Sequence, residues 1–382
     1  MKATDLPVQE TPLAPLHRRL GARMVPFAGS LLPLHYQAGI LAEHRHTRTA
    51  VSLFDLSHMG QARLEGAGFQ GLAAEFEHLV PGDILGLAPG QMRYTVLVNA
   101  DAGILDDLMV TRLAPQGEDD HLFLVVNGVP RETDFAHIRA VLGPKGPLLT
   151  ALTDRALLAL QGPHAAAVLA RLAPSFNDAV PFMRAVFLAI AGIPCLVSRS
   201  GYTGEDGFEI SVAAGEALAL AERLLAEHDV RPAGLGARDS LRLEAGLCLY
   251  GADIDATTSL LEAGLAWIIG ARRWKEANFP GAGRLLAERA TGPRRVRVGL
   301  VVEGRVPARA QAVITDPAGL PIGVVTSGGV SPTLDRPIAM GYVPPGYASP
   351  GTPVRIIVRA IPRAAEVAPL PFVAHRYHNH KR

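Results

Sequence analysis

The arrangement of apolar residues changes near residue 290, and this change limits the possible folds more than any other feature. Before that point, strand-like runs alternate with single helical segments, which is typical of α+β units with antiparallel sheets. From Arg294 onward, short β runs separated by turns follow at 296–300, 312–314, 323–326, 339–343 and 354–358. The sequence therefore predicts an α+β region followed by an all-β domain, a sandwich or a barrel, with the boundary near 285–295.

Length, charge and cysteine content narrow the class of protein. A chain of 382 residues is too long for one ordinary hydrophobic core, so two or three domains are expected. A net charge of +1 provides no excess of positive charge for binding nucleic acid or an anionic membrane, and no partner of either kind is expected. Two cysteines without metal-ligand spacing favour a reducing compartment.

The start of the chain bears on its location. Residues 1–12 are polar and contain no apolar signal core, which predicts a cytoplasmic protein. No apolar run reaches the length of a membrane span. No Gly-x-Gly-x-x-Gly motif follows a predicted strand, so a dinucleotide-binding fold is not expected.

Residues 93–99 and 104–112 are predicted to form two strands joined by a turn at 101–103. The second strand carries two adjacent carboxylates, Asp106 and Asp107, inside an apolar run. Because side chains alternate along a strand, these two lie on opposite faces, and at least one is expected to be buried or to border a cavity. Either each is held by structural hydrogen bonds, or one is a catalytic carboxylate whose pKa is raised by burial.

Two further groups of polar residues have both structural and functional interpretations. His35, His44 and His46 lie in or near a helix predicted over 38–49, and without supporting Cys or Glu spacing we expect a solvated helix face rather than a metal site. Arg238 and Arg242 are four apart and share one helix face. They are either solvated or partners of nearby acidic residues, or they contact a ligand.

Several stretches together resemble the T-protein (aminomethyltransferase) family of the glycine cleavage system, from about residue 11 to 377. The matching pieces, in chain order, are Gly21-Ala-Arg-Met-Val25, Phe54-Asp-Leu-Ser-His-Met59, Ile104-Leu-Asp-Asp-Leu108, Gly201-Tyr-Thr-Gly-Glu205, Phe208-Glu-Ile210, Gly234-Leu-Gly-Ala-Arg-Asp239, Leu241-Arg-Leu-Glu-Ala-Gly246, Thr326-Ser-Gly-Gly-Val-Ser-Pro-Thr333 and Pro371-Phe-Val373. The resemblance implies a three-domain cloverleaf around a central channel. It places two interleaved, ferredoxin-like α+β domains, the folate-binding region, in residues 1–290 and a β barrel in residues 291–382.

The resemblance also implies an activity. The family takes an aminomethyl group from the lipoyl arm of a carrier, the H-protein, and transfers the carbon to tetrahydrofolate. The products are 5,10-methylenetetrahydrofolate, ammonia and the dihydrolipoyl carrier. Loss of thiolate or ammonia from an S–CH2–NH2 group creates cationic iminium character, which a nearby carboxylate stabilises while it orients nitrogens or moves a proton. No metal site is implied.

Site residues follow from the resemblance position by position. The catalytic carboxylate is expected to be Asp106, with Asp107 as a structural residue held by backbone donors. Glu209 is expected to accept the N–H edge of the pterin in bidentate fashion, and Arg238 to contact the folate or hold Glu209. Other expected lining residues of the folate cavity are Tyr94, Leu108, Asn127, Tyr202 and Tyr377; for Tyr94 and Tyr202, ordinary core packing is the alternative.

Two related classes remain as alternatives. A non-catalytic folate-binding assembly factor for iron–sulfur proteins carries a Lys-Gly-Cys-Tyr-x-Gly-Gln signature, whereas here the chain reads Ala245-Gly-Leu-Cys-Leu-Tyr-Gly251. Cys248 is therefore interpreted as a small buried residue. A folate-binding subunit of a sarcosine or dimethylglycine demethylase would need a flavoprotein partner. Basic residues at 272–275 and 294–297 are either a docking surface for an acidic carrier or merely solvated.

Overall fold

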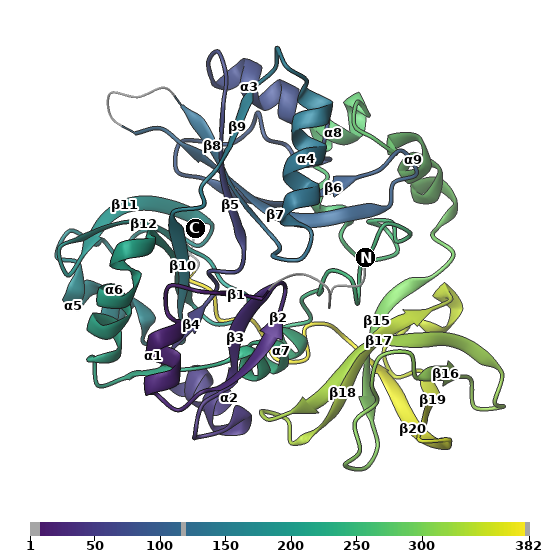
Figure 1. The fold of residues 1–382 in the computed structure, drawn as a ribbon. Coiled ribbons are helices and arrows are strands. Elements are labelled where there is room, and N and C mark those ends of the chain that lie inside the picture. Colours follow the sequence, from purple (N-terminus) through teal and green to yellow (C-terminus); the bar gives the residue numbers. More distant parts are fainter. Residues whose placement is uncertain (1–7, 116–119, 379–382) are drawn as a thin grey trace.

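The computed structural model describes residues 8–115 and 120–378, and Figure 1 shows three lobes arranged around a centre. The chain starts with a small sheet of order β1-β3-β2, in which Arg23–Phe27 (β2) runs antiparallel and Gln9–Glu10 (β1) parallel to Ser30–His35 (β3). Helices Ala14–Arg19 (α1) and Ile40–Thr49 (α2) flank it. No helix in the described ranges is long and apolar enough to cross a membrane.

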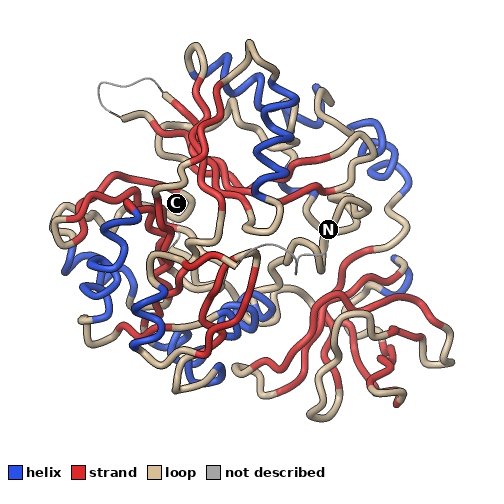
Figure 2. Tube along the Cα trace, viewed as in Figure 1, coloured by secondary structure: helices blue, strands red, loops and turns tan. Residues whose placement is uncertain are grey.

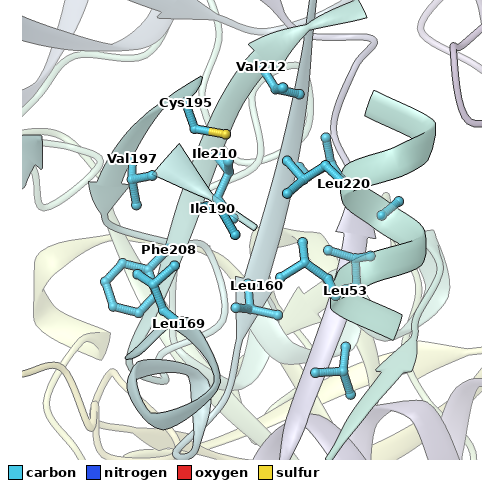
Figure 3. Close-up of a cluster of buried hydrophobic side chains, with 14 of the residues drawn as sticks. Leu53, Leu160, Leu169, Ile190, Cys195, Val197, Phe208, Ile210, Val212 and Leu220 are labelled. Atoms are coloured by element: carbon cyan, nitrogen blue, oxygen red, sulfur yellow. The ribbon is translucent and has the colours of Figure 1, made fainter. Parts of the chain in front are cut away.

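The second sheet has six strands in the order β11-β12-β13-β10-β4-β14. Its strands and helices, in chain order, are Val51–Asp55 (β4), Arg155–Gln161 (β10), Ala165–Leu172 (α5), Arg184–Ile190 (β11), Ile193–Arg199 (β12), Gly207–Ala213 (β13), Ala214–Glu216 (η1), Ala217–Leu225 (α6) and Val230–Pro232 (β14). Leu160, Ile210 and Leu220 belong to the buried cluster that α5 and α6 form with this sheet (Figure 3).

The third sheet has five strands in the order β6-β7-β8-β5-β9. Its elements are Gly60–Glu65 (β5), Phe69–Phe76 (α3), Met92–Val98 (β6), Ile104–Leu113 (β7), His121–Val126 (β8), Arg131–Leu142 (α4) and Leu148–Ala151 (β9). Phe76 of α3 and Phe135 of α4 pack on one face. A second apolar cluster, which includes Val125 and Leu157, joins this sheet to the six-stranded one. The predicted hairpin is thus present, as β6 and β7 paired antiparallel.

The all-β region is a closed barrel, which resolves the choice between a sandwich and a barrel. Helices Leu235–Glu244 (α7), Ala271–Glu276 (α8) and Ala282–Thr291 (α9), with the turn Ala266–Ile268 (η2), precede it. Its elements are Val296–Val302 (β15), Val313–Thr315 (β16), Pro321–Ser331 (β17), Arg336–Val343 (β18), Pro345–Tyr347 (η3), Pro353–Val358 (β19) and Ile361–Ala368 (β20), and the strand order is β15-β18-β17-β16-β19-β20.

Closure pairs β15 with β20 and so leaves no open sheet edge in the barrel. Figure 2 shows that this lobe is made mainly of strands and loops. The α+β region followed by a barrel is confirmed. The division of residues 1–290 into two interleaved domains stays a prediction, as does the 290/291 boundary.

Helix α2 was predicted in the right place but with the wrong face toward water. Ile40 and Leu41 are 37% and 50% exposed, whereas Glu43, His44 and Arg48 are buried. The polar face can be buried because its groups have partners. Glu43 accepts hydrogen bonds from the backbone N–H groups of Tyr36 and Gly234, at 2.5 and 2.9 Å. The expectation of a solvated histidine face is therefore wrong for His44.

The buried face of α2 enters a polar network that joins three parts of the molecule. Glu244, at the end of α7, accepts hydrogen bonds from Arg48 at 2.8 Å, from Ser331 Oγ at 2.5 Å and from the Thr333 N–H at 2.9 Å. Ser331 ends β17, so Glu244 connects α2 and α7 to the barrel. Arg48 also contacts Glu205 at 2.7 Å.

Candidate functional site

A cavity of about 580 Å³ lies where the lobes meet. Its walls come from the β6–β7 hairpin, the segment after β12, strand β13, helix α7, the loop after α7, and the C-terminal segment. A volume of this size accommodates a drug-sized or cofactor-sized ligand. Most of the residues expected at a folate site line it, namely Tyr94, Leu108, Asn127, Tyr202, Glu209, Arg238 and Tyr377.

Asp106 is absent from the cavity wall, and Asp107 is part of it. The two side chains alternate across β7, as expected, but the hairpin turns the face of Asp107 toward the cavity. Asp106 is fully buried on the other face, among residues such as Leu97 and Val110 that pack under α3 and α4. The expected placement of the pair is therefore reversed, because strand alternation separates the carboxylates but does not say which face borders the cavity.

Asp107 is held by the side chains of Tyr94 and Asn127 in addition to a backbone donor, its own N–H. Asn127 Nδ2 donates to Asp107 Oδ1 at 2.8 Å and to Asp106 Oδ1 at 2.8 Å, so one amide bridges both carboxyl groups. The hydroxyl of Tyr94 is hydrogen-bonded to Asp107. Burial, followed by the charge of Asp106, raises the pKa of Asp107 to about 7. A carboxyl group in this state can donate or accept a proton near neutral pH.

Glu209 and Arg238 are two oppositely charged residues of the cavity wall, and each influences the pKa of the other. Glu209, on β13, accepts a hydrogen bond from Ser200 Oγ at 3.1 Å. Burial raises the pKa of Glu209, while the charge of Arg238 and the bond from Ser200 oppose that rise. The Arg238 guanidinium lies 4.8 Å from the ring centroid of Tyr202, whose hydroxyl donates to the carbonyl of Cys248. This pair can bind a planar ligand edge that carries both N–H donors and an acceptor.

Aromatic rings form other parts of the wall. Phe182 and Tyr377 stack with centroids 4.1 Å apart and an interplanar angle of 8°. Tyr94 and Trp267 stack at 5.9 Å and 21°, and Trp267 is 68% exposed. The wall therefore offers flat apolar surfaces to an aromatic ligand, with one large ring at the solvent side.

The segment 370–377 leaves the barrel and returns to the lobe of β10–β12, as Figure 1 shows in yellow. It is fixed there by the Val373 N–H, which donates to the Glu244 carbonyl at 3.0 Å, and by the Arg376 N–H, which donates to the Gly204 carbonyl at 2.7 Å. The Arg376 side chain also pairs with Glu205. These contacts hold Tyr377 at the wall.

The turn after α7 places another part of the wall. Gly246 adopts φ +67°, and the Leu247 N–H donates to the Arg242 carbonyl at 3.0 Å, so the helix ends in a left-handed glycine cap. Cys248 follows this turn and is buried, as expected, and burial raises its thiol pKa to about 12. Arg242 is not solvated, since it pairs with Asp253 at 2.7 Å.

Sequence reasoning did not identify His58 or Trp267 as cavity residues. His58 is buried, its Nδ1 has no hydrogen-bond partner among the described residues, and burial lowers its pKa to about 4. It is therefore a neutral imidazole at the wall. The only feature of the sequence that draws attention to His58 is its place in the stretch 54–59, which resembles the family but by itself implies no role for the histidine. Trp267 has no comparable signal.

In the basic stretches at 272–275 and 294–297, several arginines have partners, whereas Lys275 and Arg294 are exposed. Arg272 pairs with Glu77 and, on its own helix, with Glu276, while Arg273 is buried and contacts Glu77 at 3.2 Å. Arg297 donates to the carbonyls of Ala263 and Gly246 at 2.9 Å each. These partners neutralise or occupy three of the charges, and a carrier-docking surface on the two stretches stays a prediction. Within the described ranges, no cluster of three or more His, Cys, Asp or Glu residues could hold a metal ion.

Comparisons with known proteins cover nearly the whole chain. Residues 13–273 match the GCVT N-terminal domain, and residues 295–374 match the glycine cleavage T-protein C-terminal barrel domain. The mitochondrial aminomethyltransferase of Gallus gallus is 46% identical over 380 residues, which is 97% of this chain and 94% of that protein. The probable mitochondrial aminomethyltransferase of Schizosaccharomyces pombe is 43% identical, with 98% and 96% covered.

A solved structure agrees with these matches. The crystal structure of the glycine cleavage system aminomethyltransferase T from Bartonella henselae superposes with a TM-score of 0.90 at 44% identity, and 97% of this chain and 99% of that one are covered. Several relatives are named mitochondrial, so the expected cytoplasmic location stays a prediction. Part of the polar start on which that prediction rests, residues 1–7, lies outside the described residues.

Proposed function

Because the chain belongs to the glycine cleavage T-protein family, we propose that its cavity binds tetrahydrofolate and receives the aminomethyl-lipoyl arm of a carrier protein. The chain is an aminomethyltransferase of the glycine cleavage system. The relatives bear that name at high coverage, so a demethylase subunit or an iron–sulfur assembly factor is not favoured. The acceptor, the donor and the residues that act on them are inferred from the cavity.

The observation that carries the proposal is the position of two carboxyl groups on one cavity wall. Glu209, which feels the positive charge of Arg238, suits the N–H edge of a pterin, and Asp107 is a separate carboxyl group with a near-neutral pKa. Tyr94, Leu108, Asn127, Tyr202 and Tyr377 line the space that the folate would fill. The cavity thus has one group suited to recognition and another suited to proton transfer.

In the proposed reaction, the carbon changes partners from the lipoyl sulfur to folate nitrogens. Asp107 takes the role that was expected for Asp106, because only Asp107 borders the cavity. As an anion it stabilises the iminium-like carbon, and near pH 7 it can also take a proton from a folate nitrogen or give one to the departing ammonia. Tyr94 and Asn127 orient its oxygens.

The donor is proposed to be a lipoylated H-protein. The direct test is ammonia release from aminomethylated lipoyl carrier with and without tetrahydrofolate. We expect fast release only with both substrates, formation of 5,10-methylenetetrahydrofolate in equal amount, and no activity on free glycine. If release is equally fast without folate, the folate part of the proposal is wrong.

Glu209→Gln is expected to weaken tetrahydrofolate binding by about 1.5–3 kcal/mol, the size of a charge-assisted hydrogen bond. The amide presents a donor where the pterin edge needs an acceptor. Isothermal titration calorimetry measures the change. Glu216→Gln removes an exposed carboxylate just after the same strand and is expected to leave the affinity unchanged. Unchanged affinity in Glu209→Gln would remove Glu209 from the pterin site.

A further inference from the structure

A third carboxyl group lies behind the two on β7. Asp134, on α4, is 3% exposed, and its side chain is hydrogen-bonded to Asp106. It does not line the cavity, and the reaction proposed above does not use it. The three groups form a row that runs from α4 through Asp106 to Asp107 at the cavity wall.

A hydrogen bond between two carboxyl groups requires a proton, because an ionised carboxylate only accepts. The remaining contacts indicate which group carries it. Asp106 receives donors on both oxygens: Asn127 N–H at 3.2 Å on Oδ2 and Asn127 Nδ2 at 2.8 Å on Oδ1. Asp134 Oδ2 is buried without a partner among the described residues. An ionised oxygen left in that state is costly, so the proton belongs to Asp134.

We propose that Asp134 is a positioning residue that holds a proton toward Asp106, keeps Asp106 ionised, and thereby sets the charge state of Asp107. The proposal rests on the role given to Asp107 above. The charge that Asp106 carries lies directly behind the cavity carboxyl group and disfavours a second negative charge there. Asn127 donates to both carboxyl groups, so a shift in the position of Asp106 also moves the donor that Asp107 uses.

The electrostatic surroundings are consistent with a proton on Asp134 and a negative charge on Asp106. Burial, then the charge of Asp106, raises the pKa of Asp134 to about 9, and the same two causes in the same order raise the pKa of Asp107 to about 7. The titratable groups that face the row are Tyr94 from β6, Tyr202 from the segment after β12, and Cys248 and Tyr250 from the loop after α7. Burial raises the pKa of Tyr250 to about 12, so it stays neutral throughout this range. At pH 8, between these two values, Asp134 is therefore mostly protonated and Asp107 mostly ionised.

Infrared spectroscopy of the full chain labelled with ¹³C-aspartate tests the proton directly and needs no substrate. We expect the carbonyl stretch of a buried protonated carboxyl group at pH 8, lost with a midpoint near pH 9. Asp134→Asn should remove that band, whereas Asp107→Asn should keep it. Glu132→Gln, on the exposed face of the same helix, is the matched control and should also keep it. A band that survives in Asp134→Asn, or no band in the unaltered protein, overturns the proposal.

The pH dependence of turnover tests the positioning role. In Asp134→Asn the amide still donates to Asp106, so turnover at pH 7.5 should stay within a few-fold of the unaltered protein. The fall in turnover at alkaline pH, which we link to loss of the Asp134 proton, should be absent. Asp134→Ala lacks the donor and should lose turnover across the whole range. Identical pH profiles for the unaltered protein and Asp134→Asn contradict the proposal. Because the infrared band is independent of activity, failure of Asp107 as the reacting group would leave that result intact.

Discussion

Asp107→Asn is expected to lower turnover by about 10²–10⁴-fold, the usual contribution of a positioned acid or base. The physical reason is that the carboxylate acts on charge that develops only as the carbon leaves sulfur. Asparagine can keep the contacts with Tyr94 and Asn127 but carries neither the charge nor the proton. Tetrahydrofolate affinity should therefore change only a few-fold, since the interaction lost belongs to the transition state.

Steady-state ammonia release and calorimetry measure the two quantities. Asp101→Asn removes an exposed carboxylate from the turn of the same hairpin and is the matched control. Asp106→Asn separates the two neighbours: it removes the charge behind Asp107, so the pKa of Asp107 should fall and the acidic limb of the pH profile should move to lower pH. Near-normal turnover in Asp107→Asn, together with a loss in Asp106→Asn, would restore the assignment that the resemblance implied.

Arg48→Met is expected to cost about 3–5 kcal/mol of the free energy of unfolding, as expected when one partner of a buried ion pair is removed. The side chain contacts Glu244 at 2.8 Å and Glu205 at 2.7 Å, and both carboxylates are buried. Methionine fills much of the space but leaves the carboxylates of Glu244 and Glu205 without the positive charge of Arg48. Urea unfolding measures the loss. Arg45→Met, on the exposed side of the same helix, should change stability by less than about 0.5 kcal/mol.

The same network predicts an acid-dependent part of stability. Burial alone would raise the pKa of Glu244, but the hydrogen bond and charge of His44, with donors from Ser331 and Thr333, lower it to about 2. Because the pKa of Glu244 is lower in the folded state, the group stabilises the fold above pH 4.5, its pKa in the unfolded chain, and this stability is lost as the pH falls toward 2.

If Arg48→Met and Arg45→Met lose equal stability, the buried network is not what joins α2 to α7 and the barrel.

Much of the fold could be predicted because its signals are local. The β6–β7 hairpin follows from two β-rich runs and a turn, and the barrel follows from closely spaced short strands after residue 294. Helix α2 shows where local signals fail. Its apolar residues Ile40 and Leu41 face water, because Glu43 and Arg48 meet partners from distant segments that no local pattern reveals.

The candidate site divides in the same way. The resemblance to the family implied most of the cavity wall, including Glu209, Arg238 and Tyr377, but Trp267 was missed and the positions of Asp106 and Asp107 were reversed. An isolated tryptophan has no spacing that links it to a cavity. By contrast, His58 lies in a stretch that resembles the family, and only its burial beside the cavity without a hydrogen-bond partner for Nδ1 among the described residues indicates a role.

The sequence by itself determined the class of elements, the resemblance to one family, and the fact that two adjacent carboxylates point to opposite faces of one strand. Those properties depend on backbone geometry and on residues close together in the chain. Only the tertiary structure decided which carboxylate meets the cavity, and which charged groups on α2, α7 and α8 are neutralised by partners. Those outcomes depend on contacts between segments far apart in the chain, such as Arg48 with Glu244 and Asp106 with Asp134.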